Sequence, residues 1–265
     1  ILIHGYKEWG GELPKYLNGM WSFAIYDKLK KEIFLSKDRF GEKPLFYYSK
    51  DKVFLFASEL GALTQFKKLD LKLDYSSLKK YCAYGFFPGN LTPFKNINKL
   101  EAGCNLLLDV SKTTIKKEKY WEYLIEPNYK FSESEWCEKV YDLFNKSVKR
   151  MLVADVPVGV FLSGGLDSSI ISYFSKKHSQ NTINTFSIGF EEKTFDETKY
   201  SKFFSEKIKS NHYNQIFAEN NLKKILDEFS TKIDEPISDS SLLSYYLLCK
   251  FSSNKVKVAL GGDGG

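Results

Sequence analysis

A loop of glycines and serines, placed between an apolar run and a helical pattern, is the feature that most constrains this sequence. Residues 158–162 are continuously apolar, as expected for a buried strand of a parallel sheet, and residues 166–178 have the periodicity of a helix. Ligands of open parallel sheets bind where the strands end, and the loop lies at such an end. The glycines let the backbone approach a ligand, and the first N–H groups of the helix are unpaired and partly positive. The sequence therefore predicts an anion-binding site here.

The loop consists of Ser163-Gly164-Gly165-Leu166-Asp167-Ser168-Ser169. Its three serine hydroxyls add hydrogen-bond donors, and Asp167 is a candidate ligand for a magnesium ion shared with phosphates. The chain has no G-x-x-x-x-G-K-[ST] motif and the loop has no lysine, so gripping a transferred γ-phosphate is not its expected task. The alternative is a glycine turn that merely caps a helix. That alternative accounts for a bare Ser-Gly-Gly, but not for the whole string between a buried strand and a helix.

The second half of the chain alternates between strand and helix patterns. Residues 133–151 have an amphipathic helical pattern, with Ser132 as the expected N-cap and Glu135 at the capping-box position. Strands are then predicted at residues 158–162, 184–190, 212–217 and 255–260, and helices at 166–178, 197–209, 222–233 and 242–253. This alternation predicts a doubly wound α/β domain, a parallel sheet with helices on both faces.

The first half is instead rich in short strands with polar turns between them. After a helix over residues 1–17, strands are predicted at 21–26, 33–37, 45–48, 53–58, 103–109 and 113–120, with a helix at 78–87 ended by Pro88. Closely spaced strands with short connections are typical of antiparallel sheets. Pro127-Asn128 is the predicted boundary, so we expect one domain over residues 1–127 and another over 128–265.

The loop and its surroundings resemble the asparagine synthetase family of glutamine-dependent ligases. The loop is similar to the pyrophosphate-binding loop of ATP pyrophosphatases, which several other ligase branches share. The family resemblance rests on the approach Asp155-Val156-Pro157, the strand Thr185-Phe186-Ser187-Ile188-Gly189-Phe190 and the acidic turn Phe195-Asp196-Glu197. It also rests on Asp234-Glu235-Pro236, on Asp239-Ser240-Ser241 and on the run from Val258 to Gly265, which ends in Gly261-Gly262-Asp263-Gly264-Gly265.

The resemblance implies roles for individual residues. The ATP-binding residues would be Leu162, Ser163, Gly164, Gly165, Asp167, Ser168, Ser169, Ile188, Gly261 and Gly262. Asp167 would bind Mg²⁺, and Asp263 would be the catalytic residue that organises adenylation and attack by ammonia. Gly261 stands where the family usually has a serine, so a hydroxyl contact becomes a backbone contact.

The first half resembles the later part of the family's glutaminase domain, an α+β antiparallel fold of the N-terminal-nucleophile hydrolases. The similar segments are residues 17–27, 38–45 and 56–59. By this resemblance the cysteine nucleophile would lie upstream of Ile1, and both ends of the family's sequence would lie outside this chain. We therefore expect the chain alone to be inactive as a glutaminase. Taken without the family, Asp38-Arg39 is more often a structural pair than a catalytic one.

Composition narrows the remaining function classes. The net charge is +6, but the lysines are spread along the chain, which favours solvated surfaces over a nucleic-acid site. Cys82, Cys104, Cys137 and Cys249 have no metal-site or disulfide spacing, and we expect them to be buried. We expect structural roles for His4, His178 and His212. There is no apolar run of eighteen residues and no signal sequence, so a cytoplasmic location is expected.

The resemblance predicts a complete protein that adenylates aspartate with ATP and Mg²⁺ and amidates it with ammonia from glutamine. Its partners would be small molecules, with no nucleic acid and no membrane, and a homodimer is left open. One alternative keeps the chemistry but changes the acceptor to a sugar acid or a lactam-forming carboxylate. Two further alternatives are a catalytically inactive binding protein and, on the charge alone, a nucleic-acid-binding module.

Overall fold

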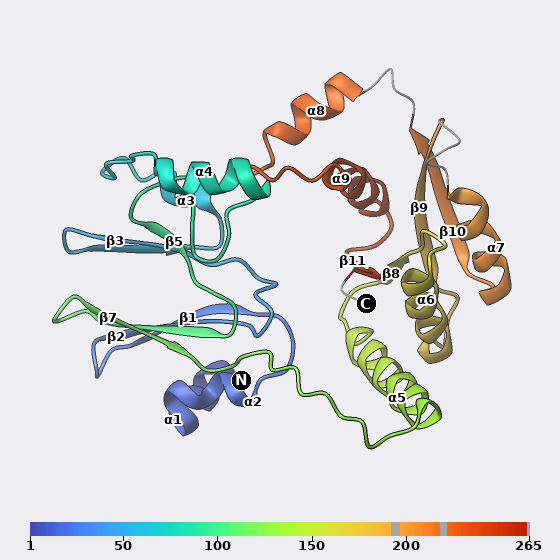
Figure 1. The fold of residues 1–265 in the computed structure, drawn as a ribbon, viewed down its shortest axis with the longest axis horizontal. Helices are drawn as coiled ribbons and strands as arrows, with labels where there is room; N and C mark the ends of the chain where they lie inside the picture. The colour runs from blue at the N-terminus through green and yellow to red at the C-terminus, as the bar shows by residue number, and fades with distance from the viewer. Residues whose placement is uncertain (192–196, 218–221, 264–265) are drawn as a thin grey trace. The chain divides into compact units, whose positions relative to one another are not determined.

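The computed structural model describes residues 1–191, 197–217 and 222–263 (Figure 1), with side chains left out at 222–224. The chain divides into two compact units. The first contains Ile1–Glu126 together with Ile233–Asp239, and the second contains Pro127–Lys232 and Ser240–Gly265. The sequence did not predict that residues 233–239, which follow a helix of the second unit, belong to the first.

The first unit is built on two antiparallel sheets that lie one above the other in Figure 1. One has the order β1 (Ser22–Asp27), β2 (Glu32–Lys37), β6 (Cys104–Asp109), β7 (Thr114–Lys119), and the other the order β4 (Val53–Ala57), β3 (Phe46–Lys50), β5 (Ile97–Lys99). Buried Leu35 and Leu106 of the first sheet cluster with Leu45 and Tyr47 from the second sheet's side. The main core of this unit therefore lies between its sheets. The predicted strands are confirmed, and β5 is added to them.

The helices of the first unit differ from the prediction at glycines. The expected helix over residues 1–17 is broken into α1 (Leu2–Trp9), a 3-10 turn (Gly10–Glu12) and α2 (Leu13–Tyr16), because Gly10 has a φ of +55°. The helix predicted at 78–87 is α4 (Tyr75–Tyr84). It begins after Asp74, whose carboxylate accepts from the Ser76 N–H, and ends at left-handed Gly85 rather than at Pro88. A short helix, α3 (Leu60–Thr64), was not predicted.

Residues 233–239 are held on the first unit by polar contacts. The Asp234 carboxylate accepts from the backbone N–H groups of Leu60 and Gly61, at the start of α3. The Lys99 ammonium lies 2.7 Å from Glu235 Oε2, in an ion pair with both side chains largely buried. Burial raises the pKa of Glu235, and the Lys99 charge opposes that rise.

The second unit is a parallel sheet in the order β10-β9-β8-β11. The strands are β8 (Val158–Phe161), β9 (Asn184–Phe190), β10 (Asn211–Phe217) and β11 (Val258–Leu260). The helices are α5 (Glu133–Met151), α6 (Leu166–His178), α7 (Thr198–Ile208), α8 (Leu222–Ser230) and α9 (Ser241–Ser252). The predicted capping box of Ser132 and Glu135 is present at the start of α5. The prediction of a parallel α/β sheet is confirmed.

Helices cover both faces of this sheet, as Figure 1 shows, with α6 and α7 on one side and α9 on the other. Alternate residues of β9 show the same division. Phe186 packs edge-to-face on Phe251 of α9, whereas Ser187 contacts Ser201 of α7 on the opposite face. The ends of the strands are therefore flanked by helices from both layers.

The prediction of four buried cysteines is wrong for three of them. Only Cys104, inside the first unit's core, is buried, while Cys82, Cys137 and Cys249 are exposed. Cys82 lies on α4, Cys137 on α5 and Cys249 on α9, each with its side chain exposed to solvent. In the part of the chain that the structure describes, no helix has both the length and the apolar character needed to cross a bilayer.

Candidate functional site

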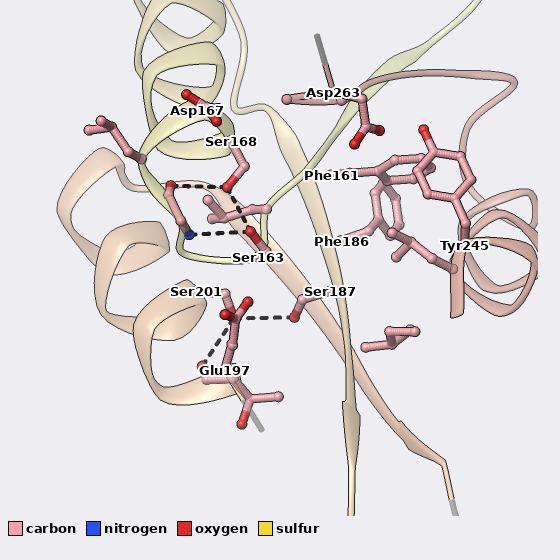
Figure 2. A pocket seen from close by; sticks show the side chains of 18 of the residues that line it. Phe161, Ser163, Asp167, Ser168, Phe186, Ser187, Glu197, Ser201, Tyr245 and Asp263 are labelled. Atoms are coloured by element: carbon pink, nitrogen blue, oxygen red, sulfur yellow. Dashed lines mark hydrogen bonds between the residues drawn. The ribbon is translucent and has the colours of Figure 1, made fainter. Parts of the chain in front are cut away.

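A pocket of about 380 Å³ opens where the strands of the second unit end. Its walls come from the loop after β8, the end of β9, the start of α7, one side of α9 and the turn after β11 (Figure 2). Its volume falls in the range of small-molecule and cofactor sites. This is the position at which an open parallel sheet binds its ligand.

Hydrogen bonds fix the loop between β8 and α6 in shape before any ligand binds. Ser163 Oγ accepts from the Gly165 N–H at 3.2 Å and lies 3.0 Å from Ser168 Oγ. Ser168 Oγ also donates to the Gly165 carbonyl oxygen at 3.2 Å, so its proton has a partner within the loop. The proton of the Ser163–Ser168 bond therefore comes from the exposed Ser163, and it can turn from Ser168 to a bound oxyanion beside the unpaired first N–H groups of α6.

Two glycines allow neighbouring segments to touch this loop. Gly164 has a φ of +95°, and a Cβ there would lie 2.7 Å from the backbone nitrogen of Ser201 in α7. A Cβ on Gly262 would lie 2.8 Å from the backbone nitrogen of Ser168. Both positions thus require glycine, because the backbones approach too closely for a side chain. The loop therefore packs closely against the backbone of α7 and against that of the turn after β11.

Asp263 lies on the α9 side of the pocket, near the ring of Tyr245 (Figure 2). The Tyr245 ring packs edge-to-face on Phe161. Burial, followed by the nearby Asp263 carboxylate and a hydrogen bond to it, raises the pKa of the Tyr245 phenol. A neutral phenol next to a carboxylate donates a hydrogen bond to that carboxylate. Tyr245 is thus placed to orient Asp263.

The acidic groups of the pocket fit a cation shared with a ligand better than a cation held by protein alone. Asp167, Glu197 and Asp263 line the pocket, but among the described residues no group of three or more His, Cys, Asp or Glu side chains could hold a metal ion. Mg²⁺ usually takes one or two carboxylates and completes its shell with water and phosphate oxygens. The carboxylates of Asp167 and Asp263 suit that pattern.

The structure brings together most residues that the sequence singled out. Nine line the pocket: Leu162, Ser163, Gly165, Asp167, Ser168, Ile188, Gly261, Gly262 and Asp263. Gly164 is the part of the loop that packs against α7 and does not line the pocket. Ser169 lies within α6, where its N–H donates to the Gly165 carbonyl oxygen. Phe195, Asp196, Gly264 and Gly265 lie outside the described residues.

Several lining residues were not predicted from sequence. They are Phe161, Leu166, Phe186, Ser187, Phe190, Glu197, Thr198, Ser201, Tyr245 and Leu248. Of these, Leu166, Phe186, Ser187, Phe190 and Glu197 had been quoted only as parts of longer motifs. Ser201 and Tyr245 lie inside helical patterns, where polar and aromatic residues are ordinary. Their presence in the pocket follows only from the packing of α7 and α9 against the sheet.

In the first unit, Asp38 has a structural role. Its carboxylate accepts from the N–H groups of Phe40 and Glu42 at one oxygen, and from those of Trp21 and Lys43 at the other. The group is 1% exposed, so these donors replace its hydration. The Arg39 guanidinium instead donates to the Lys15 carbonyl oxygen at 3.4 Å. Asp38 organises the turn after β2 and has no ligand-facing oxygen left over.

Comparison with known families divides the chain in the same order as its patterns. Residues 1–121 match the model of the glutamine amidotransferase domain, and residues 139–265 match that of asparagine synthase. The two matches follow one another without overlap. Together they cover most of both compact units, and residues 122–138 lie between the two matches.

Curated relatives match over the whole chain. A putative glutamine-hydrolysing asparagine synthetase 2 of Methanocaldococcus jannaschii is 38% identical over 270 residues, covering 100% of this chain and 52% of the relative. A putative enzyme of the same name from Mycobacterium tuberculosis is 29% identical, over 99% of this chain and 41% of the relative. Glutamine-hydrolysing asparagine synthetase 1 of Bacillus subtilis is 28% identical, over 100% and 41%. The chain thus spans about half the length of the curated relatives it matches.

Proposed function

The chain belongs to the family of glutamine-hydrolysing asparagine synthetases, and on that basis we propose that the full protein is an ATP-dependent carbon–nitrogen ligase. It adenylates the side-chain carboxylate of aspartate, releases pyrophosphate, and replaces AMP with ammonia derived from glutamine. The observation that carries the proposal is the single pocket formed by the Ser163–Ser169 loop and the turn that holds Asp263.

The loop supports the pyrophosphate part of this reaction. When a carboxylate oxygen attacks the α-phosphorus of ATP, the bond to the β,γ-pyrophosphate breaks and negative charge develops on that leaving group. The N-terminal N–H groups of α6 and the Ser163 hydroxyl are fixed donors at the place where this charge appears. Because the loop is already held by its own hydrogen bonds, only the Ser163 hydroxyl has to turn toward the leaving group.

Mg²⁺ is the cation that fits the pocket's donor set. Asp167 and Asp263 are the residues that would hold it, together with phosphate oxygens of the substrate. A bound magnesium ion would neutralise phosphate charge and so favour departure of pyrophosphate. Asp167 stays exposed at the first turn of α6, where a carboxylate is also favoured by the helix dipole.

The adenine and acceptor ends of the pocket are assigned from its lining. Ile188 and Phe190, both partly exposed, give the end of β9 an apolar surface suited to the base. Asp263 and Tyr245 lie where the turn after β11 and α9 line the pocket, and there the acceptor carboxylate and ammonia would meet. There the product amide forms as nitrogen bonds to the acyl carbon and the carbon–oxygen bond to AMP breaks.

The first unit is the proposed source of ammonia. Its two stacked antiparallel sheets are consistent with part of an α+β glutaminase domain of the N-terminal-nucleophile type, and the glutamine amidotransferase match covers most of it. We propose glutamine as the nitrogen donor of the full protein on this ground.

The test is AMP and pyrophosphate release by the full-length protein, supplied with MgATP and ammonia, in the presence and absence of aspartate. Aspartate-dependent AMP with an equal amount of asparagine is the expected result. AMP that appears only with a sugar acid or a lactam-forming carboxylate would keep the ligase and reject aspartate. Nucleotide binding without AMP formation, whichever carboxylate is offered, would reject the ligase.

A variant of Asp167 tests the role of the loop. Asp167→Ala should lower AMP formation without unfolding the protein, because it removes a carboxylate of the proposed magnesium site. Asp142→Ala is the matched control, since Asp142 is an exposed residue of α5 that pairs only loosely with Lys146, 3.5 Å away. Wild-type turnover by the Asp167 variant would contradict this role.

A further inference from the structure

His212 lies behind the pocket and contacts three hydroxyl groups from two elements. It is on β10 beside Thr185 of β9, its partner in the sheet register. Its Nδ1 lies 3.0 Å from Thr185 Oγ1, and its Nε2 lies 3.2 Å from Ser187 Oγ and 3.4 Å from Ser201 Oγ. All three hydroxyl residues are buried, and Ser187 and Ser201 line the pocket. The imidazole is therefore a link between the sheet, α7 and the pocket wall.

The number of available protons sets the tautomer of this ring. Ser187 donates its one proton to Asn214 Oδ1 at 3.1 Å, and Ser201 shares its proton between the Thr198 carbonyl oxygen at 3.0 Å and Ser187 Oγ at 3.3 Å. Both serine oxygens then face Nε2 with lone pairs, so Nε2 must carry the hydrogen and share it between them. Nδ1 is left as an acceptor for the Thr185 hydroxyl, whose oxygen also lies 2.9 Å from Ser210 Oγ. The contacts thus describe a neutral ring with its proton on Nε2.

Ser201 connects the ring to the phosphate-binding loop. It lies in the first turn of α7, and its backbone nitrogen is 2.7 Å from the position of a Cβ on Gly164. The Ser201 side chain is 0% exposed, so it has no solvent contact to replace a lost partner. A contact that fixes Ser201 therefore also fixes the surface against which Gly164 packs (Figure 2 shows Ser201 beside Ser187, on the α7 side of Ser163).

We propose that His212 is a positioning residue for nucleotide binding, acting through its Nε2–H on Ser187 and Ser201. By holding α7 against Gly164, it keeps the loop in the shape that receives phosphate. The inference rests on the proposed nucleotide function of the pocket. It assigns His212 a part in affinity for ATP, and none in contact with ATP itself.

Two substitutions at His212 distinguish the contacts of Nε2 from the contact of Nδ1. In Gln the terminal amide nitrogen reaches about as far as Nε2, whereas in Asn the amide group reaches only as far as Nδ1. His212→Gln should keep the contact with the serine pair, and His212→Asn should keep only the contact with Thr185. For the full-length protein we expect the Kd for MgATP to rise about tenfold in His212→Asn, the effect of one net hydrogen bond, and to stay near wild type in His212→Gln.

Ser201→Ala gives a second route should the Asn variant fail to fold. It removes the oxygen that receives Nε2–H, so the Kd for MgATP should again rise about tenfold. Ser205→Ala is the control, because Ser205 is also buried on α7 but does not line the pocket. Its hydroxyl donates to the Lys202 carbonyl oxygen at 2.7 Å, and its own carbonyl oxygen accepts from Ser210 Oγ at 3.4 Å. A merely structural role would lower thermal stability in both serine variants without separating their nucleotide affinities.

The measurement is titration of each variant with MgATP, accompanied by ¹⁵N spectra of the His212 ring. Affinity lost in His212→Asn and Ser201→Ala but kept in His212→Gln and Ser205→Ala, with a proton on Nε2 in the wild type, supports the inference. Equal affinity in all four variants, or a proton on Nδ1, overturns it. Failure of the wild-type protein to bind MgATP would instead reject the proposed function, so the two failures are distinguishable.

Discussion

A Cβ on Gly262 would lie 2.8 Å from the backbone nitrogen of Ser168 and 3.1 Å from the carbonyl carbon of Asp167. The turn after β11 is therefore in backbone contact with the first turn of α6. These two segments carry the two halves of the proposed site, and they can meet only because position 262 has no side chain.

Gly262→Ala should separate the two segments and weaken nucleotide binding. We expect the Kd for MgATP to rise at least about tenfold, or about 1.4 kcal/mol, because backbone atoms cannot yield as a flexible side chain does. Gly11→Ala is the control, since a Cβ there would meet only the Phe34 ring, at an ordinary 4.0 Å, and Gly11 does not line the nucleotide pocket. Titration calorimetry on both variants measures the difference. Equal affinities would show that the close approach is unimportant for binding.

Tyr245→Phe should slow the chemical step more than it weakens nucleotide binding. The phenol proton is placed to orient Asp263, and its loss should lower kcat about tenfold, the effect of one hydrogen bond. Tyr246→Phe is the control on the same helix, because its hydroxyl bonds to Glu228 Oε1 at 2.7 Å, away from the pocket. The assay is single-turnover AMP formation. A raised Kd with unchanged kcat would contradict the orienting role.

Local signals in the sequence predicted the elements best. The boundaries of α5, α6 and β9 agree with the prediction residue for residue, because a capping box, a glycine loop and a short apolar run each act within a few residues. The end of α4 was predicted at Pro88, but the helix ends earlier, at Gly85, which has a left-handed conformation. The loop was singled out because it follows a strand of a parallel sheet, whereas the turn after β11 was assigned to the same site by the family resemblance.

What the sequence could not predict depends on long-range packing. Asp234 contacts Leu60 and Gly61, which lie more than 170 residues earlier in the chain, and no local pattern indicates such a pairing. His212 was expected to have a bland structural role, since an isolated histidine in a strand gives no sign of the hydroxyls around it. Only the register between β9 and β10 and the packing of α7 bring Ser187 and Ser201 to its ring.

Asp38→Asn should destabilise the first unit although it changes no shape. Each carboxylate oxygen accepts two backbone N–H groups, so an amide must turn its NH₂ group toward two donors. We expect a loss of about 3 kcal/mol in the free energy of unfolding, as for buried charge-assisted hydrogen bonds left without an acceptor. Urea denaturation with hydrogen exchange at residues 38–43 measures it.

Asp27→Asn is the control for this substitution. At the turn between β1 and β2, only the Oδ1 atom of Asp27 accepts backbone N–H groups, those of Leu29 and Lys30. An asparagine can keep that oxygen in place and turn its NH₂ group elsewhere. An equal loss of stability in the two variants would refute the assignment of Asp38 as the organiser of its turn.

Stability of the second unit should fall as the pH drops below the usual histidine range. Burial lowers the pKa of His212 from its ordinary value of 6.5, so the unfolded chain takes up the proton before the folded chain does. The stabilisation is complete above pH 6.5 and is lost as the pH falls from 6.5 through the lower folded value. The ring's hydrogen-bonding neighbours Thr185 and Ser187 on β9 and Ser201 on α7 carry no charge, so within the described part of the chain these contacts do not compensate a protonated imidazole. Thermal melts of the wild type and of His212→Gln between pH 5 and 8 should therefore diverge only at the acid end, with the wild type losing more stability. Parallel curves would mean that His212 titrates normally and that its burial has no energetic consequence.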